Sequence, residues 1–251
     1  WNDTATLLVN IANISNITLS GLTVTYDGQV HSLVISGDET QHGLTVPVRY
    51  AMSPEDLANG GILNGAKSAG SYTIYAYVNE EGLTGYNSNY NELPLNATLL
   101  INTAQMYNTT DSSTNFYFTN ESLTYDSYVY YVNVVLTAAT DSLSTSNTTT
   151  LPVSPANATG YSGDQATIIY MYSLVSGGPY NSVFQGTKNS GTYYLEATMS
   201  NSNYISKVYT ATLSISPLSR TLIWSGDQST YTYNGFDQIG NIGVYYELVN
   251  N

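Results

Sequence analysis

The chain has 251 residues, enough for one large domain or two ordinary ones. Only 9% of its residues are charged, against about a quarter in typical soluble proteins, and its formal net charge is −13. Five basic residues in total argue against a nucleic-acid partner, which needs clustered Lys and Arg, and the absence of cysteine excludes disulfides and thiolate metal sites. No apolar run reaches the length of a membrane span.

Residues 1–18 open with a short alternating strand, Ala5–Val9, followed by a connector. This strand is a copy of one that closes each of two later units, where it reads Ala97–Ile101 and Ala211–Ile215. Period two places side chains on one face of a strand. We therefore expect residues 1–18 to be the terminal strand of a preceding repeat plus a connector.

Residues 19–104 are expected to form the first full unit. A strand at 22–26 ends in Asp27-Gly28, a turn signal, and residues 46–50 read as a strand near a proline. After a loop at 54–64 come the long alternating strand at 72–78 and the terminal strand at 96–102.

Residues 105–217 repeat this order as a second unit. The stretch Gly186–Met199 matches Gly65–Val78 in its two glycines, lysine, hydroxyl residue and tyrosine, with apolar residues at every second position behind the tyrosine. Residues 168–172 correspond to 46–50, which aligns Tyr172 with Tyr50. Residues 138–166 carry little apolar content and are predicted to be an inserted surface loop.

Residues 218–251 begin a third unit and stop before its later strands. Short strands with turn signals every 8–12 residues predict an all-β fold of tandem immunoglobulin-like antiparallel β-sandwiches, arranged as beads on a string. Eight side chains of the two matching strands should face the cores: Tyr72, Ile74, Ala76, Val78, Tyr193, Leu195, Ala197 and Met199.

The ordered motifs resemble the MBG and YDG-type repeats: Tyr26-Asp27-Gly28 near the start, Gly-Ser-Tyr or Gly-Thr-Tyr before an alternating strand, Asn-Tyr, then Ala-Thr-Leu at the end. Those repeats occur in tandem in very large prokaryotic surface proteins and adhesins. The resemblance covers about 20–104 and 105–217, departs at Ser127 and at the insertion, and implies an Ig-like sandwich with a stalk or adhesive role.

No residue constellation indicates catalysis, a metal or a cofactor, so we do not expect an enzyme. His31 and His42 read as surface or turn histidines, and the acidic pairs 38–39, 55–56 and 80–81 as solvated loop carboxylates. Lys67 and Lys188 occupy equivalent turns; an isopeptide crosslink there is the alternative to an exposed charge.

The polar surface is rich in Ser, Thr and Asn, which favours an extracellular, cell-surface location. Tyrosine-rich faces leave carbohydrate binding open. Asn-x-Ser/Thr sequences allow N-glycosylation at eight positions: Asn2, Asn13, Asn16, Asn96, Asn108, Asn120, Asn147 and Asn157.

We expect a structural protein that forms a surface filament, stalk or adhesin shaft, with neighbouring copies or adjacent repeats as partners. Its ragged ends suggest head-to-tail assembly, in which the strand carrying Ala5, Leu7 and Val9 completes the half-sandwich of another copy. The alternative is an adhesin module that binds glycans or host surfaces through the loops 54–64 and 138–166.

Overall fold

The computed structural model of the chain describes residues 8–37, 40–41, 43–53, 64–110, 112–156, 163–226 and 242–248. Within these ranges the chain consists of strands and turns, with no helix. The expected all-β class is confirmed for this part of the chain. No helix there is long and apolar enough to cross a membrane.

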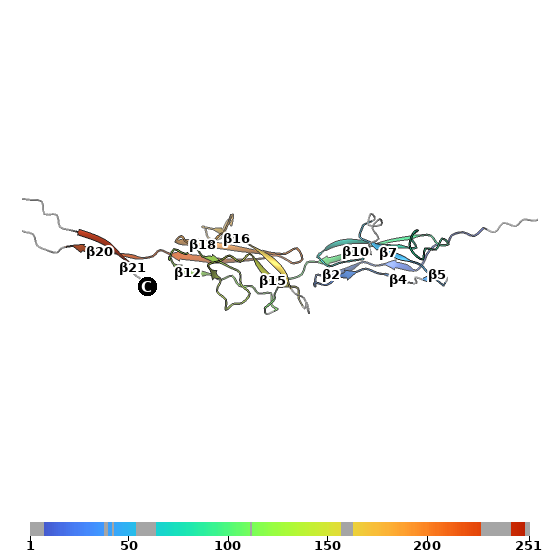
Figure 1. The fold of residues 1–251 in the computed structure, drawn as a ribbon, viewed down its shortest axis with the longest axis horizontal. Helices are drawn as coiled ribbons and strands as arrows, with labels where there is room; N and C mark the ends of the chain where they lie inside the picture. Colours follow the sequence, from blue (N-terminus) through green and yellow to red (C-terminus); the bar gives the residue numbers. More distant parts are fainter. Residues whose placement is uncertain are drawn as a thin grey trace, which may run out of the picture. The chain divides into compact units, whose positions relative to one another are not determined.

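A four-stranded sheet forms the first part of the fold (Figure 1). Its strands lie side by side in the order β2 (Leu22–Thr25), β10 (Leu93–Asn102), β9 (Gly70–Val78) and β7 (Val48–Ala51). β9 and β10 pair antiparallel, whereas β2 runs parallel to β10 with Leu22 opposite Leu99. This parallel pair departs from the wholly antiparallel sandwich that the sequence predicts.

Three short antiparallel pairs accompany this sheet. They are β1 (Ile17–Leu19) with β4 (Ile35–Gly37), β3 (His31–Ser32) with β8 (Gly65–Ala66), and β5 (Thr40–Gln41) with β6 (Leu44–Thr45).

The core of this part lies between β9 and the β1–β4 pair. Ala76 and Val78 of β9 are fully buried and pack in one cluster with Ile17 of β1 and Ile35 of β4. Burying a valine or isoleucine side chain favours folding by about 1.5–3 kcal/mol. The two layers of strands therefore share one apolar interior, as a sandwich requires.

Ile14 and Ile17 are buried in the same cluster, although the sequence assigns both to the connector. These two residues thus contribute to the core of this part, and the predicted boundary after residue 18 stays a prediction. Because these two residues are three positions apart, they do not show the alternation by which a strand is recognised.

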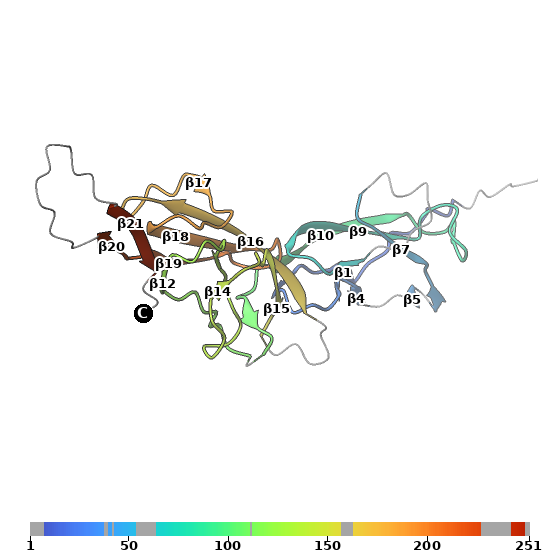
Figure 2. The same cartoon turned by 60° about the vertical axis from the view of Figure 1, so that its left-hand side comes forward.

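A larger sheet follows, with the order β11, β15, β16, β18, β19 and β12, and with β17 also paired to β16 (Figure 2). Its strands are β11 (Tyr107–Asn108), β12 (Glu121–Thr124), β15 (Thr150–Ser154), β16 (Asp164–Ser173), β17 (Ser182–Val183), β18 (Gly191–Ser200) and β19 (Lys207–Ser216). β12 runs parallel to β19, as β2 does to β10. β13 (Tyr131–Val132) pairs with β14 (Leu143–Ser144) outside this sheet.

The inserted loop predicted at 138–166 is wrong in part. β14 and β15 lie inside this range, and β15 pairs with both β11 and β16. Leu151 and Val153 of β15 are buried, so two apolar residues at period two were enough to make a strand among polar neighbours.

The predicted inward faces of the matching strands β9 and β18 are confirmed for six of the eight side chains. Their alternate residues are fully buried: Ile74, Ala76, Val78, Leu195, Ala197 and Met199. The two tyrosines at their starts, Tyr72 and Tyr193, are only half-buried.

The predicted match of Tyr172 with Tyr50 is wrong by two residues. The Tyr50 hydroxyl accepts a hydrogen bond from the amide of Ile35, at 2.9 Å, and the Tyr170 hydroxyl accepts one from the amide of Val134, at 3.0 Å. Tyr170 is therefore the counterpart of Tyr50. Counting back from the matching strand misplaces it because loop lengths differ between the two copies.

Near the end of the chain, β20 (Arg220–Gly226) pairs antiparallel with β21 (Ile242–Leu248). These two strands are what the structure describes of the predicted third unit.

The chain divides into two compact units. The first is Trp1–Phe116, Thr149–Ile169 and Thr198–Val208; the second is Tyr117–Thr148, Tyr170–Ala197 and Tyr209–Asn251. The predicted division into repeats at residues 104 and 217 stays a prediction.

Candidate functional site

The Tyr-Asp turn has the same geometry in both copies. Gly28 has a φ of +79°, and Ser127, which replaces it, adopts +76°. The Asp27 carboxylate accepts the amide of Gln29 at 2.9 Å, and that of Asp126 accepts the amide of Tyr128 at 3.0 Å. The substitution at 127 therefore changes the residue and keeps the turn.

Each turn carboxylate also has a partner four residues on. His31 Nε2 lies 2.9 Å from Asp27 Oδ1, so His31 is a turn histidine, as expected, while His42 lies outside the described residues. Partial burial would raise the pKa of Asp27, but hydrogen bonds from Gln29 and His31 outweigh it and lower that pKa.

In the second copy the Tyr130 hydroxyl donates to Asp126 Oδ2 at 2.6 Å. This bond, followed by the one from the Tyr128 amide, lowers the pKa of Asp126. The same bond raises the pKa of Tyr130.

The tyrosine at the start of each matching strand closes the turn before it. Tyr72 donates its hydroxyl to the carbonyl of Ser68, at 2.9 Å, and Tyr193 to the carbonyl of Asn189, at 3.1 Å. The tyrosine of the Gly-x-Tyr motif thus stabilises the turn and fixes where the following strand begins.

The chain enters the two sheets through equivalent bridges. The Ala12 amide donates to the Asn89 carbonyl at 2.8 Å, and the Ala12 carbonyl accepts the Asn91 amide at 2.8 Å. Ala104 makes the same pair of bonds with Asn203 and Ile205, both at 2.9 Å. Both connectors run parallel to the Asn-Tyr loop that they contact.

The first compact unit also holds a cluster around Tyr26. The Tyr26 hydroxyl donates to Asp164 Oδ2 at 2.8 Å, and its ring meets the Tyr204 ring edge-on with centroids 5.4 Å apart. The amide of Ala69 donates to Asn203 Oδ1 at 2.9 Å. Tyr26 and Tyr204 are 2% and 3% exposed.

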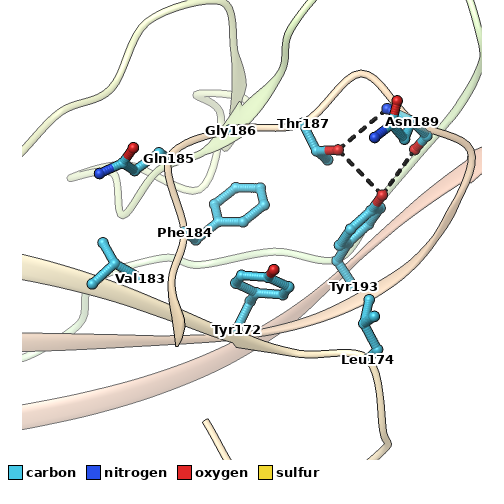
Figure 3. A pocket seen from close by; sticks show the side chains of 9 residues that line it. All are labelled: Tyr172, Leu174, Val183, Phe184, Gln185, Gly186, Thr187, Asn189 and Tyr193. Carbon is cyan, nitrogen blue, oxygen red and sulfur yellow. Dashed lines mark hydrogen bonds between the residues drawn. The ribbon is translucent and has the colours of Figure 1, made fainter. Parts of the chain in front are cut away.

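A hollow of about 420 Å³ lies in the second unit, beside β16 and β17 (Figure 3). Three rings pack against one another there, those of Tyr172, Phe184 and Tyr193, with centroids 5.9–6.3 Å apart. The exposed apolar residues Leu174 and Val183 stand at its rim.

Polar groups complete this aromatic hollow. Thr187 Oγ1 and the Asn189 carbonyl both lie within hydrogen-bonding distance of the Tyr193 hydroxyl, as the dashed lines in Figure 3 show. Gln185 lines it as well. Apolar ring faces beside amides and a hydroxyl suit an amphipathic ligand. The hollow lies outside the loops 54–64 and 138–166 that the sequence favoured for binding, and residues 54–63 are not described.

The described sequons divide by burial. Five asparagines are exposed: Asn13, Asn16, Asn96, Asn120 and Asn147. Asn108 is fully buried. Its side-chain Nδ2 donates to the Asn115 carbonyl, and its Oδ1 accepts the Thr110 amide, so the folded protein has no room for a glycan there. Asn2 and Asn157 lie outside the described residues.

Both candidate crosslinking lysines, Lys67 and Lys188, are exposed, which favours a surface charge over an isopeptide bond in an apolar site.

Glu80 forms a two-point ion pair with Arg49. The Arg49 side chain is 9% exposed and lies over the Tyr77 ring. Sequence reasoning missed this pair, because residues 31 positions apart give no local signal. No group of three metal-ligand side chains gathers within the described residues.

Of the predicted donated strand, Ala5 and Leu7 lie outside the described residues. Leu8 and Val9 are 80% and 78% exposed, and Ile11 is 57% exposed.

No family model and no curated protein matches the chain. Among solved structures, human protocadherin-24 EC1-2 is 10% identical, with a TM-score of 0.24 over 81% of this chain and 98% of that one. DIP-gamma IG1+IG2 is 9% identical, with a TM-score of 0.24 over 81% and 96%. Mouse cadherin-23 EC22-24 is 14% identical, with a TM-score of 0.25 over 80% and 67%. Similarity this low carries no functional argument.

Proposed function

We propose that the chain is a non-enzymatic extracellular structural protein, a segment of a surface filament, stalk or adhesin shaft built from tandem β-sandwich repeats. The observation that carries this proposal is the repeated entry bridge. Ala12 and Ala104 each dock on both sides to an Asn-Tyr loop, with hydrogen bonds of 2.8–2.9 Å.

A connector bonded in this way cannot behave as a free linker. Hydrogen bonds on both sides of one residue remove its freedom to rotate, so the entering residue is held against the loop of the repeat that it enters. Repeats joined by the same short contact suit a load-bearing shaft. The two copies also share the hydrogen bonds of the Tyr-Asp turn and of the tyrosine that begins the matching strand. These polar side chains stabilise the backbone, which supports a structural role.

Assembly by strand donation is part of this proposal. Leu8, Val9 and Ile11 are large apolar side chains left mostly in water, in a segment whose sequence copies a buried closing strand. Insertion beside the half-sandwich of β20 and β21 in another copy would bury the face that carries Ala5, Leu7 and Val9.

The test is deletion of residues 1–9, which keeps Ala12 and its bonds. Electron microscopy of the full chain should show filaments, and the deletion should give monomers with unchanged circular dichroism. Val9→Asp should also block assembly, while Leu8→Asp, on the opposite face of the strand, serves as the matched control and should weaken it less. A deleted chain that still polymerises rules out strand donation.

We also propose glycans at the exposed sequons, which supports an extracellular location. Intact-mass and peptide mass spectrometry of native material should find added hexose at some of these five sites and none at Asn108. Peptides that carry all five exposed sites without added mass would reject this.

A second candidate function is glycan binding, favoured by the aromatic hollow at Tyr172 and Phe184. Sugar rings have apolar faces and a hydroxyl rim, which match three aromatic rings beside amide and hydroxyl groups. Binding on a glycan array that is lost in Tyr172→Ala and kept in Tyr128→Ala, an exposed tyrosine outside the hollow, would establish it. Equal signals from both variants would reject it.

A further inference from the structure

One end of the first sheet is covered by side chains from later in the chain. Tyr26 of its Tyr-Asp turn is 2% exposed, because the Tyr204 ring and the Asp164 carboxylate cover it. Beside it, the amide of Ala69 is occupied by Asn203 Oδ1 at 2.9 Å. An Asn-Tyr loop therefore sits on a surface made of a Tyr-Asp turn and the turn before the matching strand.

The same surface exists a second time at the equivalent end of the larger sheet. The amide of Tyr125 donates to the Ser216 carbonyl at 2.9 Å, as that of Tyr26 donates to Asn102 at 2.9 Å. Ser190 precedes the glycine of the matching strand as Ala69 does. Here Tyr125 is half-buried and Ser190 is exposed.

A hollow of about 420 Å³ marks this second surface. Its lining comes from the turn and strand start at 190–192 and from the end of β19 and the following residue, 214–217. These are the counterparts of 69–71 and 100–103, beside which Asn203 sits on the first sheet.

The complementary loop also exists a second time. Asn87 Oδ1 accepts the amide of Asn89 at 3.0 Å, as Asn201 Oδ1 accepts that of Asn203 at 2.9 Å. Asn89, the counterpart of Asn203, is exposed, and Tyr90 is the counterpart of Tyr204. One molecule thus carries both halves of a contact that it already makes once within itself.

We propose that the hollow at 190–192 and 214–217 binds the Asn87–Tyr90 loop of a second copy, with the exposed Asn89 side chain accepting a hydrogen bond from the Ser190 amide, while Tyr90 stays buried in its own core. Such a contact joins different surfaces of two identical molecules, so it propagates head to tail. It deepens the proposed shaft, on which it rests, by naming where two copies meet.

Covalent trapping suits a contact of this size, because one loop in one hollow buries little area and is weak alone. The 251-residue chain contains no cysteine, so introduced thiols are the only ones in it. Ser190→Cys and Asn89→Cys are made as separate proteins, mixed, and treated with a short bismaleimide. The expected product is a heterodimer crosslinked between positions 190 and 89, at least tenfold above the background yield. A chain that carries both substitutions should give a ladder of multimers.

Two controls set the scale. Ala69→Cys/Asn203→Cys in one chain should close within the molecule, because it reproduces the contact already present. Asn147→Cys replaces Asn89→Cys as the background, since Asn147 is another exposed asparagine outside the Asn87–Tyr90 loop.

A yield of the 190–89 crosslink no higher than that of the 190–147 crosslink, with the internal control closed, overturns the proposal. A thiol at position 190 that resists N-ethylmaleimide in the monomer also overturns it, because the surface would then be covered within the chain. Filaments seen by electron microscopy without the 190–89 crosslink would reject this contact and leave the proposed shaft standing.

Discussion

At the scale of single residues, the polar side chains of the two Tyr-Asp turns stabilise the backbone of those turns. Ser127 shows how strongly the fold demands one turn, since it holds a left-handed conformation that an L-residue adopts at a cost of about 1–2 kcal/mol. The carboxylate beside it, Asp126, anchors two groups on the same turn.

Exchanging serine and glycine at positions 127 and 28 should change the free energy of unfolding in opposite directions. Ser127→Gly should raise the free energy of unfolding by about 0.5–1 kcal/mol, because glycine adopts a positive φ without strain and offsets part of that gain by its greater freedom when unfolded. Gly28→Ser should lower it by about 1 kcal/mol or more, since Gly28 is also buried. Urea unfolding measures both; loss of stability in Ser127→Gly would contradict the shared turn.

The turn carboxylates also predict the response to acid. The folded-state pKa values of Asp27 and Asp126 are lowered. Their stabilising contribution is therefore fully present above the unfolded value of about 3.9 and is lost as pH falls through the folded pKa. Thermal midpoints should stay level from pH 7 to about 4 and fall below that, and Asp126→Asn should reduce the fall. Cooperative unfolding between pH 5 and 4 would contradict this.

At the scale of elements, alternation predicts which face of a strand is buried, and long-range hydrogen bonds decide its register. β9 and β18 match their predicted faces, whereas β16 is shifted by two residues relative to the prediction. The residue that reveals the shift is Tyr170, whose hydroxyl meets the amide of Val134 across the interior. Burial raises the pKa of Tyr170 to about 12, with a smaller opposing effect from that amide, so it stays protonated in ordinary buffers.

Removing that hydroxyl should be costly. In Tyr170→Phe the amide of Val134, a residue only 1% exposed, loses its partner, which should lower the free energy of unfolding by about 1–3 kcal/mol. Tyr172→Phe, two residues along the same strand, is the control and should change it by less than about 0.5 kcal/mol. A larger loss of stability in Tyr172→Phe than in Tyr170→Phe, measured by urea unfolding, would show that Tyr172 is the counterpart of Tyr50 after all.

At the scale of the whole molecule, a net charge of −13 opposes association of identical copies. Only 5 basic residues offset 18 acidic ones, so the carboxylates of one copy mostly meet carboxylates of the next and repel them.

Association should therefore strengthen when this charge is reduced or screened. Lowering the pH from 7 toward 4 protonates carboxylates, and raising salt from about 0.01 to 0.15 M shortens the screening length from about 30 to 8 Å. Sedimentation velocity should show larger species under both conditions. Assembly that is strongest at pH 7 in low salt would show that charge does not govern it.

The all-β class, the repeated motifs, the buried faces of β9 and β18 and the equivalence of the two Tyr-Asp turns could all be predicted from the amino-acid sequence. These are local properties, because alternation, glycine placement and turn chemistry are all read within a few residues. Only the tertiary structure decided the burial of Ile14 and Asn108, the place of β15 in a sheet, the partner of Tyr170 and the aromatic hollow at Phe184. Asn108 finds its side-chain partners nearby, at Thr110 and Asn115. The other features depend on contacts between residues farther apart in the chain, whose pairing is set by packing of the sheets and leaves no mark on the neighbouring sequence.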